Sequence, residues 1–579
     1  MRRPVRLLGV SAIAIALVAA GCSKNSGSDD TDTNTGKSTA AVLVDDATGP
    51  APAVPGAKSG GTIYLPESGD YEHLDPARDY VVTSQSIGQT FRRMLTAFRE
   101  NGDGKLEVVG DLATNTGEKS DGGRTWTYHL RDGIKYEDGS TITSADIAYG
   151  IARSFSPTLA EGPHYIQAWL AGNANYNATY KGPYDGASKL PPGVTTPDSK
   201  TIVFKFKDPE PDLPFALTLP TDVPVPAAKD TKGLYDNRPF SSGPYKIQSY
   251  VRNQKLVLVK NTYWDPKTDP VRHQYPDQII STLTVTQDQA TNALIADRGA
   301  DQTSLTSEDM AIPAALYPKA IATPASKARI LHGTTQFVWQ LAFNTQRVTD
   351  LKVRQAMNYA IDKQGLLKVW GSYSGLPATT ILSPTTSGYK KYDAYPGGTN
   401  GNVAKAKELL GNKRVKLSYA YRNTERNQAI AAFLISSLKP AGFDITAQPI
   451  DKDQWYTVIG KKNNPFDLYL TGWGSDWPGA STVIPVLFDG KRITPEGNSG
   501  YTYLNVPEVN DKIDQILKVT DLTKAAGEWA DLDEEIMTKY APQVPVIYDQ
   551  QTTMFGSKVG GIYLSIPYGT AGLNNIYVK

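Results

Sequence analysis

Strand patterns and helix patterns alternate along the second half of the chain, and this alternation limits the possible folds more than any other feature. From about Gln278 onwards, short apolar runs are followed by stretches with helical periodicity. One apolar stripe consists of Val353, Met357, Ala360 and Ile361 on a single helix face. Two further helices are expected over residues 404–410 and 428–438. Alternation of this kind is typical of an α/β lobe, in which helices cover a sheet.

A second feature is the stretch over residues 466–479, where an apolar run passes into a loop. The first five residues are mostly apolar or aromatic and predict a buried strand. The second half contains the strand-breaking residues Gly472, Gly474, Pro478 and Gly479. We therefore expect a rigid strand that cannot continue past these glycines and ends in a loop.

This loop carries two indoles and one carboxylate. Trp473 and Trp477 offer flat apolar walls, and Asp476 offers a negative charge, so together they suit a pocket for an organic cation. A cation held over an aromatic face and paired with a carboxylate gains from both interactions once water is excluded. The alternative interpretation is a core tryptophan followed by a surface turn with a solvated Asp476.

The amino terminus has the pattern of an export signal. Arginines precede an uncharged apolar run over residues 7–20, which is too short to persist as a membrane anchor. Small residues follow, and then Cys22, the only cysteine in the chain, in a context that resembles a bacterial lipobox although Ala19 stands where Leu is usual. We predict a signal peptide over residues 1–21 and lipidation of Cys22. The alternative is a plain signal peptide with an incidental cysteine.

Residues 22–59 are rich in Ser, Thr, Asp, Gly, Pro and Ala and have no apolar periodicity. Such a composition cannot bury enough surface to order itself, so we predict a disordered tether. The chain has 579 residues, too many for one core, and two or three lobes are expected. Its formal net charge of +1 argues against nucleic acid as the main partner.

Three other stretches have distinctive local patterns. Residues 125–155 combine an alternating strand, two glycine turns and a helix that begins at Thr143, with Asp146 placed to complete a capping pair. Residues 241–264 contain a Ser-Gly-Pro-Tyr-Lys turn entering a strand, a second strand, and then Asn-Thr-Tyr-Trp. Residues 343–362 contain Phe-Asn-Thr and, after it, the helical stripe described above.

These stretches, together with the loop containing Asp476, resemble the extracytoplasmic solute-binding proteins of the oligopeptide, dipeptide and nickel class (family 5), which serve ABC importers. The matching motifs occur in the family's order and span nearly the whole mature chain. The resemblance implies an α/β fold of the large, type II periplasmic-binding-protein kind, with mixed sheets flanked by helices. It also implies two lobes that close on a ligand across a hinge of two crossing strands, and an extra domain inserted in the first lobe.

Mapped onto this chain, the resemblance implies a first lobe built from three segments, an inserted domain and a second lobe. The first lobe would comprise residues 60–95, 198–275 and 544–579, the inserted domain residues 96–197, and the second lobe residues 276–543. The closed form would dock on an ABC permease that this sequence does not contain. We expect a monomer, anchored by its lipid to the outer face of the bacterial cell membrane.

The resemblance also implies ligand contacts near the loop. Asp476 occupies the place of the carboxylate that pairs with a peptide's α-ammonium group, and Trp473 and Gly474 match neighbours in the same pocket. One position departs from the pattern, because peptide binders can carry an arginine where this chain has Leu470. The carboxylate end of a peptide would therefore need another cation.

Four further positions match the family's ligand contacts. Tyr80 and Val82 correspond to positions beside an extended peptide, and Ser242 and Tyr263 correspond to contacts near the hinge. Each of the four also fits an ordinary loop or core position. The expected ligand is a di- or oligopeptide. An oligosaccharide or a nickel chelate is the alternative within the family, since the tryptophans and the excess of Tyr (32) over Phe (14) would also suit sugar stacking.

A secreted hydrolase is the alternative from the enzyme class. Asp533, Glu534 and Glu535 form a carboxylate cluster, but their helical pattern predicts a solvated face rather than a catalytic pair. The chain has no Gly-x-Ser-x-Gly or His-Glu-x-x-His motif, and its five histidines lack ligand spacing. We expect no catalytic residue, no cofactor and no dedicated metal site. A structural surface lipoprotein is the third class, favoured only if no ligand stabilises the protein.

Overall fold

The structure is a computed structural model that describes residues 41–579 apart from 101–103, 160, 186–189, 399 and 453. The predicted signal peptide, the predicted lipidation at Cys22 and residues 22–40 of the predicted tether lie outside the described residues.

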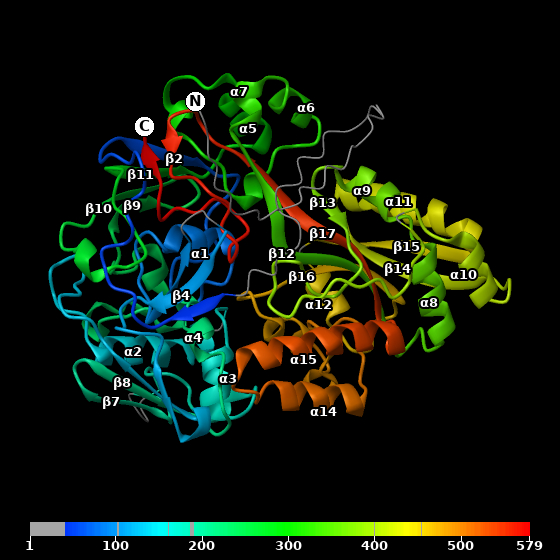
Figure 1. Ribbon diagram of the computed structural model, residues 1–579, viewed down its shortest axis with the longest axis horizontal. Helices are drawn as coiled ribbons and strands as arrows, with labels where there is room; N and C mark the ends of the chain where they lie inside the picture. The colour runs from blue at the N-terminus through cyan, green and yellow to red at the C-terminus, as the bar shows by residue number, and fades with distance from the viewer. Residues whose placement is uncertain (1–40, 101–103, 160, 186–189, 399, 453) are drawn as a thin grey trace, which may run out of the picture. The chain divides into compact units, whose positions relative to one another are not determined.

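The first lobe is organised around a four-stranded sheet of order β2-β11-β10-β9 (Figure 1). Its strands are β2 (Thr62–Pro66), β9 (Tyr245–Val251), β10 (Lys255–Lys260) and β11 (Gln278–Thr282), with the small pair β18 (Val559–Gly560) and β19 (Tyr577–Val578) as a separate sheet. The two strands expected within residues 241–264 are β9 and β10, and they are antiparallel partners. Alternate residues such as Leu256 and Leu258 are fully buried, as the period of a half-buried strand requires.

Two smaller sheets form the inserted domain. They have the orders β1-β4-β3 and β5-β6-β8-β7. Their strands are β1 (Val42–Val44), β3 (Thr96–Glu100), β4 (Leu106–Gly110), β5 (Glu118–Ser120), β6 (Thr125–His129), β7 (Val194–Asp198) and β8 (Thr201–Lys205). The helices of this half are α1 (Val82–Gly88), α2 (Ser144–Ser154), α3 (Tyr165–Ala171) and α4 (Leu213–Ala216). The predicted capping pair at the start of α2 is confirmed, because Thr143 and Asp146 form a reciprocal capping box.

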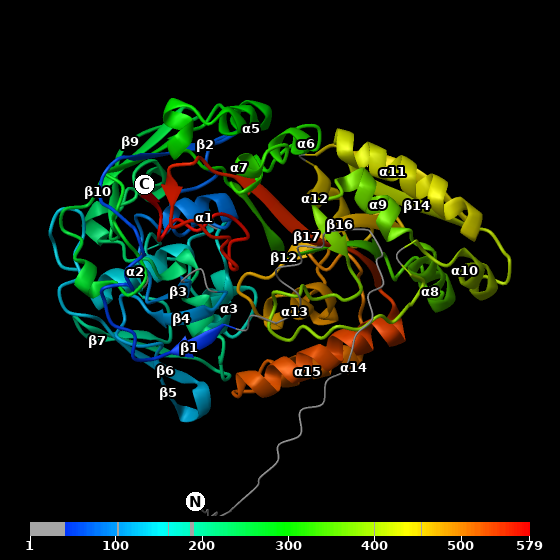
Figure 2. The same cartoon turned by 45° about the horizontal axis from the view of Figure 1, so that its top comes forward.

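The second lobe contains a six-stranded mixed sheet of order β13-β17-β12-β16-β14-β15. Its strands are β12 (Ile330–Phe343), β13 (Gly375–Pro377), β14 (Val415–Arg422), β15 (Phe443–Ile450), β16 (Leu468–Gly474) and β17 (Gln543–Met554). Helices α9 and α11 lie along this sheet (Figures 1 and 2) and share an apolar core with it. The described helices after α4 are α5 (Gln287–Ala296), α6 (Tyr317–Ala320), α7 (Pro324–Lys327), α8 (Leu351–Ala360), α9 (Lys363–Trp370), α10 (Val403–Leu409), α11 (Glu425–Leu438), α12 (Trp455–Ile459), α13 (Ile484–Phe488), α14 (Pro507–Ile516) and α15 (Leu522–Glu535).

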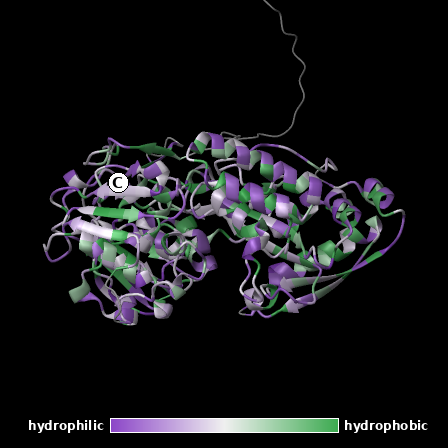
Figure 3. Cartoon of the chain, turned by 90° about the horizontal axis from the view of Figure 1, so that it is seen from below, coloured by the Kyte–Doolittle hydropathy of each residue, from purple (hydrophilic) through white to green (hydrophobic). Residues whose placement is uncertain are grey.

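The three helices predicted from apolar periodicity correspond to α8, α10 and α11. The exposed helices carry hydrophobic and hydrophilic residues in alternation (Figure 3), as helices with one buried face do. No helix among the described residues has the length and apolar character that crossing a membrane requires.

Two long strands connect the lobes. β12 and β17 are antiparallel partners from Ile330 opposite Met554 to Ala342 opposite Gln543. Met554 belongs to a small core that also contains Leu294 of α5, whereas the other end of the pair joins the core of the six-stranded sheet. These are the two crossing strands that the resemblance implies.

Sheet pairing moves three of the predicted domain boundaries. β7 and β8 are paired across the predicted boundary at 197/198, and one core extends from Leu95 to Leu219. β11 pairs with β2 and β10, so residues after 276 still belong to the first lobe. β17 lies in the sheet of the second lobe, whereas the sequence predicts that residues 544–579 belong to the first. Each boundary depends on strand pairing between distant segments, and the local sequence does not encode that pairing.

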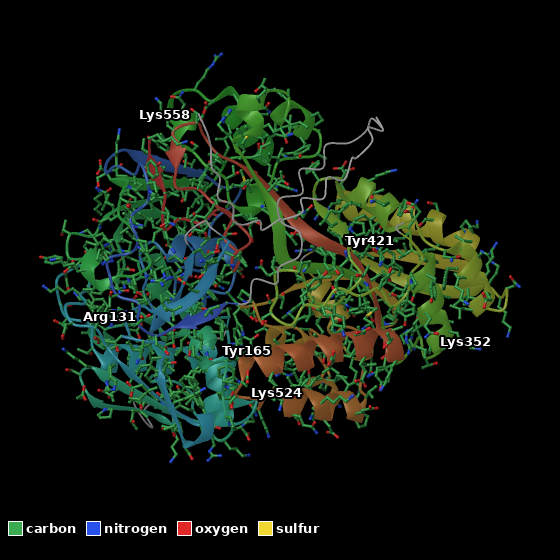
Figure 4. All side chains as sticks on the ribbon, in the orientation of Figure 1. Arg131, Tyr165, Lys352, Tyr421, Lys524 and Lys558 are labelled. Atoms are coloured by element: carbon green, nitrogen blue, oxygen red, sulfur yellow. The ribbon has the colours of Figure 1, made fainter. Side chains whose placement is uncertain are left out.

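The predicted disordered tether over residues 22–59 is wrong for its second part. β1 pairs in parallel with β4, and Ala47 and Ala51 are buried. Arg131, labelled in Figure 4, donates a hydrogen bond of 2.7 Å to the carbonyl oxygen of Ala47. Polar composition did not prevent order here, because the inserted domain supplies a strand edge and hydrogen-bond donors for the segment.

The predicted solvated face at the end of α15 is also wrong for one residue. Asp533 is only 1% exposed, and its carboxylate accepts hydrogen bonds from the backbone amides of Ile381 and Leu382, each at 3.1 Å, and from the Tyr392 hydroxyl at 2.5 Å. The side chain therefore anchors the loop that follows β13. A carboxylate occupied in this way is a structural acceptor.

Candidate functional site

β16 leads into the loop that carries Asp476, and it is longer than predicted. The strand continues to Gly474, with Gly472 opposite Trp339 of β12 and Gly474 opposite Phe337. A β-carbon on Gly472 would come within 2.9 Å of the Trp339 ring, and one on Gly474 within 2.8 Å of the Phe337 ring. The strand therefore continues through Gly472 and ends at Gly474, and at both positions the missing side chains make room for aromatic rings of the neighbouring strand.

Asp476 lies where three parts of the molecule meet. Its carboxylate oxygen Oδ2 accepts hydrogen bonds from the Tyr80 hydroxyl, at 2.9 Å, and from the Tyr165 hydroxyl. Tyr80 comes from the first lobe and Tyr165 from α3 of the inserted domain, near the start of α15 (Figure 4). The backbone amide of Asp476 donates to Thr482 Oγ1 at 3.1 Å, which fixes the loop.

The electrostatic state of Asp476 follows from its burial. Burial raises the pKa of its carboxyl group to about 6, although the hydrogen bonds from Tyr165 and Tyr80 act in the opposite direction. The two phenols stabilise the ionised form but bring no positive charge. A cation that reached this carboxylate would gain a charge-assisted interaction in a site shielded from water.

Trp477 is buried between the domains and does not form an open wall. It is 2% exposed and belongs to the core of the inserted domain. Its ring centre lies 4.6 Å from that of Tyr165 and 6.4 Å from that of Trp169. Its ring is already covered by aromatic side chains and anchors the Asp476 loop to α3, and its contact with a ligand stays a prediction.

The other predicted residues of the loop and of the Tyr80 segment lie close by. The Trp473 indole is partly buried against the core around α13, and its Nε1 donates to the carbonyl oxygen of Thr482 at 2.9 Å. Tyr80 is 38% exposed, and Val82, the first residue of α1, is half-buried. The structure thus brings Tyr80 and Asp476 into contact, with Gly474 two residues before the carboxylate and Val82 two residues after the phenol.

Ser242 and Tyr263 have other roles. Ser242 is 1% exposed, and its hydroxyl oxygen accepts a hydrogen bond from the backbone amide of Arg93 at 3.0 Å. The Tyr263 ring lies against Gly139, where an added β-carbon would come within 2.7 Å of it. These interactions lie within the first lobe and along the turn that precedes α2, and the assignment of both residues as ligand contacts near the hinge stays a prediction.

Buried charges hold the segment that carries Tyr80. Arg153 of α2 forms two hydrogen bonds of 2.8 Å with the two carboxylate oxygens of Asp75, and its Nε lies 3.1 Å from Asp230 Oδ1. His73 Nδ1 lies 2.7 Å from Asp236 Oδ2. The geometry of the Arg153–Asp75 pair is bidentate, which gives directional as well as electrostatic constraint. The position of Tyr80 therefore depends on side chains of the inserted domain.

A row of side chains continues from Trp339 along the same face of the sheet. The Trp339 and Trp370 ring centres are 4.8 Å apart, and the Arg426 guanidinium carbon lies 4.8 Å from the centre of the Trp370 ring. Trp339 Nε1 donates to Asp549 Oδ1 at 3.3 Å. Leu470, where peptide binders can carry an arginine, is 6% exposed and packs in the apolar core of the second lobe.

Sequence reasoning missed Tyr165, Trp169 and Arg426. Tyr165 and Trp169 are four residues apart on α3, so an aromatic pair at helical spacing was the available signal within a stretch otherwise rich in loop residues. Nothing in the local sequence distinguishes Arg426 from other exposed arginines. Within the described residues, no three His, Cys, Asp or Glu side chains are arranged to hold a metal ion.

Comparisons with known proteins agree with this architecture. The pattern of the bacterial extracellular solute-binding proteins, family 5 Middle, matches residues 107–495. The periplasmic murein peptide-binding protein MppA of Escherichia coli (strain K12) is 26% identical over 526 residues, covering 87% of this chain and 91% of MppA. The periplasmic oligopeptide-binding protein OppA of Salmonella typhimurium is 23% identical over 473 residues, covering 79% of this chain and 81% of OppA.

A solved structure has the same fold. The clavulanic acid biosynthesis oligopeptide binding protein 2 superimposes with a TM-score of 0.84 at 29% sequence identity, covering 93% of this chain and 99% of that protein. The predicted two-lobed α/β fold, with mixed sheets flanked by helices, is confirmed by this superposition and by the sheets described above.

Proposed function

Because the chain belongs to the bacterial extracellular solute-binding proteins of family 5, we propose that it captures a di- or oligopeptide between its lobes and delivers it to an ABC importer. The single observation that carries this proposal is the position of Asp476. Its carboxylate is half-buried, and among the described residues it accepts hydrogen bonds from two neutral phenols, Tyr80 of the first lobe and Tyr165 of the inserted domain. The names of MppA and OppA, which refer to peptides, support the same ligand class.

Asp476 would bind the α-ammonium group of the peptide. The ammonium would contribute a positive charge that neither Tyr80 nor Tyr165 provides, while the phenols keep the carboxylate oriented. Gly474 lies two residues before Asp476, and the Phe337 ring fills the space that a side chain on Gly474 would occupy.

The peptide carboxylate needs a separate cation, since Leu470 is apolar and buried. Arg426 is the candidate for this role. Its guanidinium stacks on Trp370, and the Trp370 ring contacts Trp339. Trp339 lies against Gly472 of β16, the strand that precedes Asp476. Stacking on an aromatic face leaves the edge of a guanidinium available for bidentate binding of a carboxylate.

Closure would follow from contacts that both lobes make to one ligand. A ligand shifts an open–closed equilibrium only by its differential affinity for the two states, and a decisive shift takes about 5 kcal/mol. The Asp476–Tyr80 hydrogen bond already joins the two sides at 2.9 Å. A peptide held by Asp476, Tyr80 and Arg426 would add ionic contacts to that junction.

The membrane location is a proposal based on the sequence. The predicted export signal is followed by small residues and by Cys22, the only cysteine of the chain. This pattern supports cleavage before Cys22 and attachment of lipid to its thiol. Cys22→Ser should release the exported protein from the membrane fraction into the soluble fraction. Equal partitioning of the two forms would contradict the anchor without affecting the peptide proposal.

Asp476→Asn tests the ligand role. We expect trialanine binding to weaken by roughly 2–4 kcal/mol, the range for removing one partner of a buried charge pair, with little change in thermal stability. Isothermal titration calorimetry measures the affinity, and Asp531→Asn, which removes a charge from the exposed face of α15, is the matched control. Unchanged affinity in Asp476→Asn would exclude this carboxylate from the site.

The pH dependence has a defined sign. Since burial raises the pKa of Asp476 to about 6, the carboxylate is ionised above this pH and protonated below it. Affinity for an ammonium ligand should therefore fall as the pH decreases through about 6. A bound ammonium favours the ionised carboxylate and so lowers its pKa, which predicts proton release on binding near pH 6.

An oligosaccharide or a nickel chelate remains the alternative ligand class, and hydrolysis the alternative activity. Thermal unfolding against panels of peptides, sugars and nickel chelates separates them, since a ligand of the native state raises the midpoint. The carboxylate proposed for hydrolysis, Asp533, is occupied by two amides and a hydroxyl, which disfavours catalysis there. Turnover of any panel member would contradict the receptor function.

A further inference from the structure

A single tryptophan of the second lobe completes the core of the inserted domain. Among the described residues, the buried members of that core other than Trp477 all come from residues 95–219. Trp477 is 2% exposed, although the loop that carries it follows β16 of the second lobe. The ring therefore reaches from one body of the protein into another, and it lies one residue after Asp476.

Aromatic side chains of the inserted domain form the socket for this ring. The centre of the Trp477 ring lies 4.6 Å from that of Tyr165 and 6.4 Å from that of Trp169, and both pairs meet edge to face. Phe206 meets Trp169 in the same manner at 6.4 Å. Edge-to-face pairs attract one another beyond the area that they bury. Tyr165, Trp169 and Phe206, called here the socket, thus hold the indole as a pocket holds the aromatic anchor of a protein–protein interface.

Further contacts between the inserted domain and the second lobe surround the socket. Leu522, the first residue of α15, packs against the same core, and α3 lies next to the start of α15 (Figures 1 and 2). Lys518 Nζ lies 3.4 Å from Asp208 Oδ1, with both side chains about half exposed. A β-carbon on Gly123 would lie 3.4 Å from Thr520 Cγ2. An apolar centre with an exposed polar rim is the anatomy of an interface between separate bodies.

The inserted domain is attached to the first lobe in a different way. Arg93 Nε lies 2.7 Å from Asp111 Oδ1, and Arg272 Nη2 lies 2.9 Å from Asp111 Oδ2, with all three side chains at most 2% exposed. The buried Arg153–Asp75 pair described above joins the same two parts. Separating buried ion pairs leaves charges without partners, which is strongly unfavourable. The inserted domain is therefore a fixed part of the first-lobe body, and movement of the lobes would instead separate the ring from its socket.

The contact in the socket can be broken without leaving a buried charge. Trp477 Nε1 has no hydrogen-bond partner among the described residues, and a buried donor without an acceptor is less stable than one in water. The Lys518–Asp208 pair at the rim is exposed and contributes little. Burial of the ring favours the closed arrangement, while hydration of its N–H group favours release. The socket therefore suits a reversible attachment.

We propose that Trp477 is a clasp, which holds the second lobe against the inserted domain before any ligand binds. The same loop carries Asp476, whose carboxylate accepts a hydrogen bond from the Tyr165 hydroxyl, so that insertion of the ring also completes the ligand site. The apparent affinity of a ligand for the closed form is proportional to the fraction of molecules that are closed. The clasp therefore sets the affinity for every ligand of the site. This inference goes beyond the proposed function, because it concerns the protein without a ligand.

Small-angle X-ray scattering tests the clasp directly. The protein is first unfolded and refolded to remove any ligand that co-purifies with it. The wild-type protein should have the same radius of gyration with and without trialanine. Trp477→Ala should be expanded without trialanine and return to the wild-type radius when it is saturated with trialanine, because the peptide then supplies the contacts that close the lobes.

Three further variants separate the clasp from a general loss of stability. Trp477→Phe keeps a ring in the socket and should stay compact. Trp169→Ala removes part of the socket and should expand the ligand-free protein, and because Trp169 is half-buried this variant tests the clasp even if Trp477→Ala does not fold. Trp529→Ala is the matched control, since Trp529 is 4% exposed in a core of the second lobe. It should lower the thermal midpoint and leave the radius of gyration unchanged.

Calorimetric titrations measure the effect on binding. Trp477→Ala should weaken trialanine, Ala-Phe-Ala and Ala-Lys-Ala by the same factor, about tenfold if the closed fraction falls from near one to near one-tenth. Trp169→Ala should weaken the three peptides equally as well, and Trp529→Ala should leave their affinities at the wild-type level. Equal factors are the signature of a change in the protein rather than in a contact with one peptide side chain.

The outcomes decide the clasp independently of the peptide proposal. A wild-type protein that is expanded without ligand and contracts on binding would overturn the clasp, as would ligand-free Trp477→Ala and Trp169→Ala variants as compact as the wild type. Losses that differ between the three peptides would also overturn it and would assign Trp477 to a direct ligand contact. If no peptide binds, the proposed function fails, while the scattering of the ligand-free variants still decides the clasp.

Discussion

Tyr80 and Asp476 meet in one hydrogen bond, yet the chain holds them in different ways. Tyr80 lies on a segment without regular structure between β2 and α1, and buried ion pairs such as Arg153–Asp75 fix that segment. Asp476 follows β16, which is held by backbone pairing and by an apolar core that includes Leu468. The comparison teaches that one half of the site depends on charge and the other on apolar burial.

The difference has a physical basis in hydrogen-bond supply. A strand satisfies its backbone groups with its neighbours, so its side chains need only bury apolar surface. The Tyr80 segment lacks such neighbours, and Asp236 instead accepts hydrogen bonds from the backbone amides of Leu74 and Asp75. Conditions that alter charge should therefore affect the two halves unequally.

The largest expected effect comes from breaking the charged half. Arg153→Met leaves the buried carboxylates of Asp75 and Asp230 without their cation, which should reduce the free energy of unfolding by about 3–5 kcal/mol in urea titrations. The matched control is Arg414→Met, which removes an exposed ion pair with Asp444 and should change the free energy of unfolding far less. Similar losses in both variants would show that burial does not set the strength of the Arg153 pairs.

A somewhat smaller loss is expected from the apolar half. Leu468 is fully buried at the start of β16, and Leu468→Ala should lower stability by about 3 kcal/mol through lost burial and a residual cavity. Because no titrating group is changed, the loss should be the same at pH 7 and pH 5. A loss that depends strongly on pH across this interval would break the comparison.

The smallest expected effect is on the stability of the protein at acidic pH. Burial raises the pKa of Asp236, but the hydrogen bonds from His73 and from the backbone amides outweigh it and hold the pKa below its usual value. A lowered pKa contributes stability above the unfolded value of about 3.9, and this contribution is lost as the pH falls below it. Asp236→Asn should therefore flatten the decline in stability between pH 5 and pH 3.

The measurement is the unfolding free energy as a function of pH, with Leu468→Ala as the reference. That variant should retain the wild-type slope, since it changes no charge. If Asp236→Asn also retained it, the His73–Asp236 contact would not contribute to the acid sensitivity of the Tyr80 segment.

Much of the fold was predictable because its signals are local. Helical periodicity predicted α8, α10 and α11, and the spacing of Thr143 and Asp146 predicted a capping box that is present. The glycines of β16 show the limit of the same reasoning. Glycine weakens an isolated strand, but at Gly472 and Gly474 it accommodates rings from β12, a neighbour more than a hundred residues away in sequence.

Much less of the site was predictable. Asp476 and Tyr80 were named from the sequence, and they are in contact. Trp477, which the sequence predicts to contact a ligand, is buried against Tyr165 and Trp169, because α3 supplies an aromatic surface that the loop sequence does not reveal. Ser242 matched a family motif, yet it serves the packing of the first lobe.

The sequence alone determined the α/β class, the exported character of the chain and the acidic residue on which the proposed function depends. These features follow from periodicity, composition and residue type within short windows. Only the tertiary structure decided which side chains meet Asp476, where the domains divide, and that residues 41–59 are ordered against the body of the protein. Each of these depends on contacts between segments far apart in the chain, and such contacts leave no mark on the local pattern of either partner.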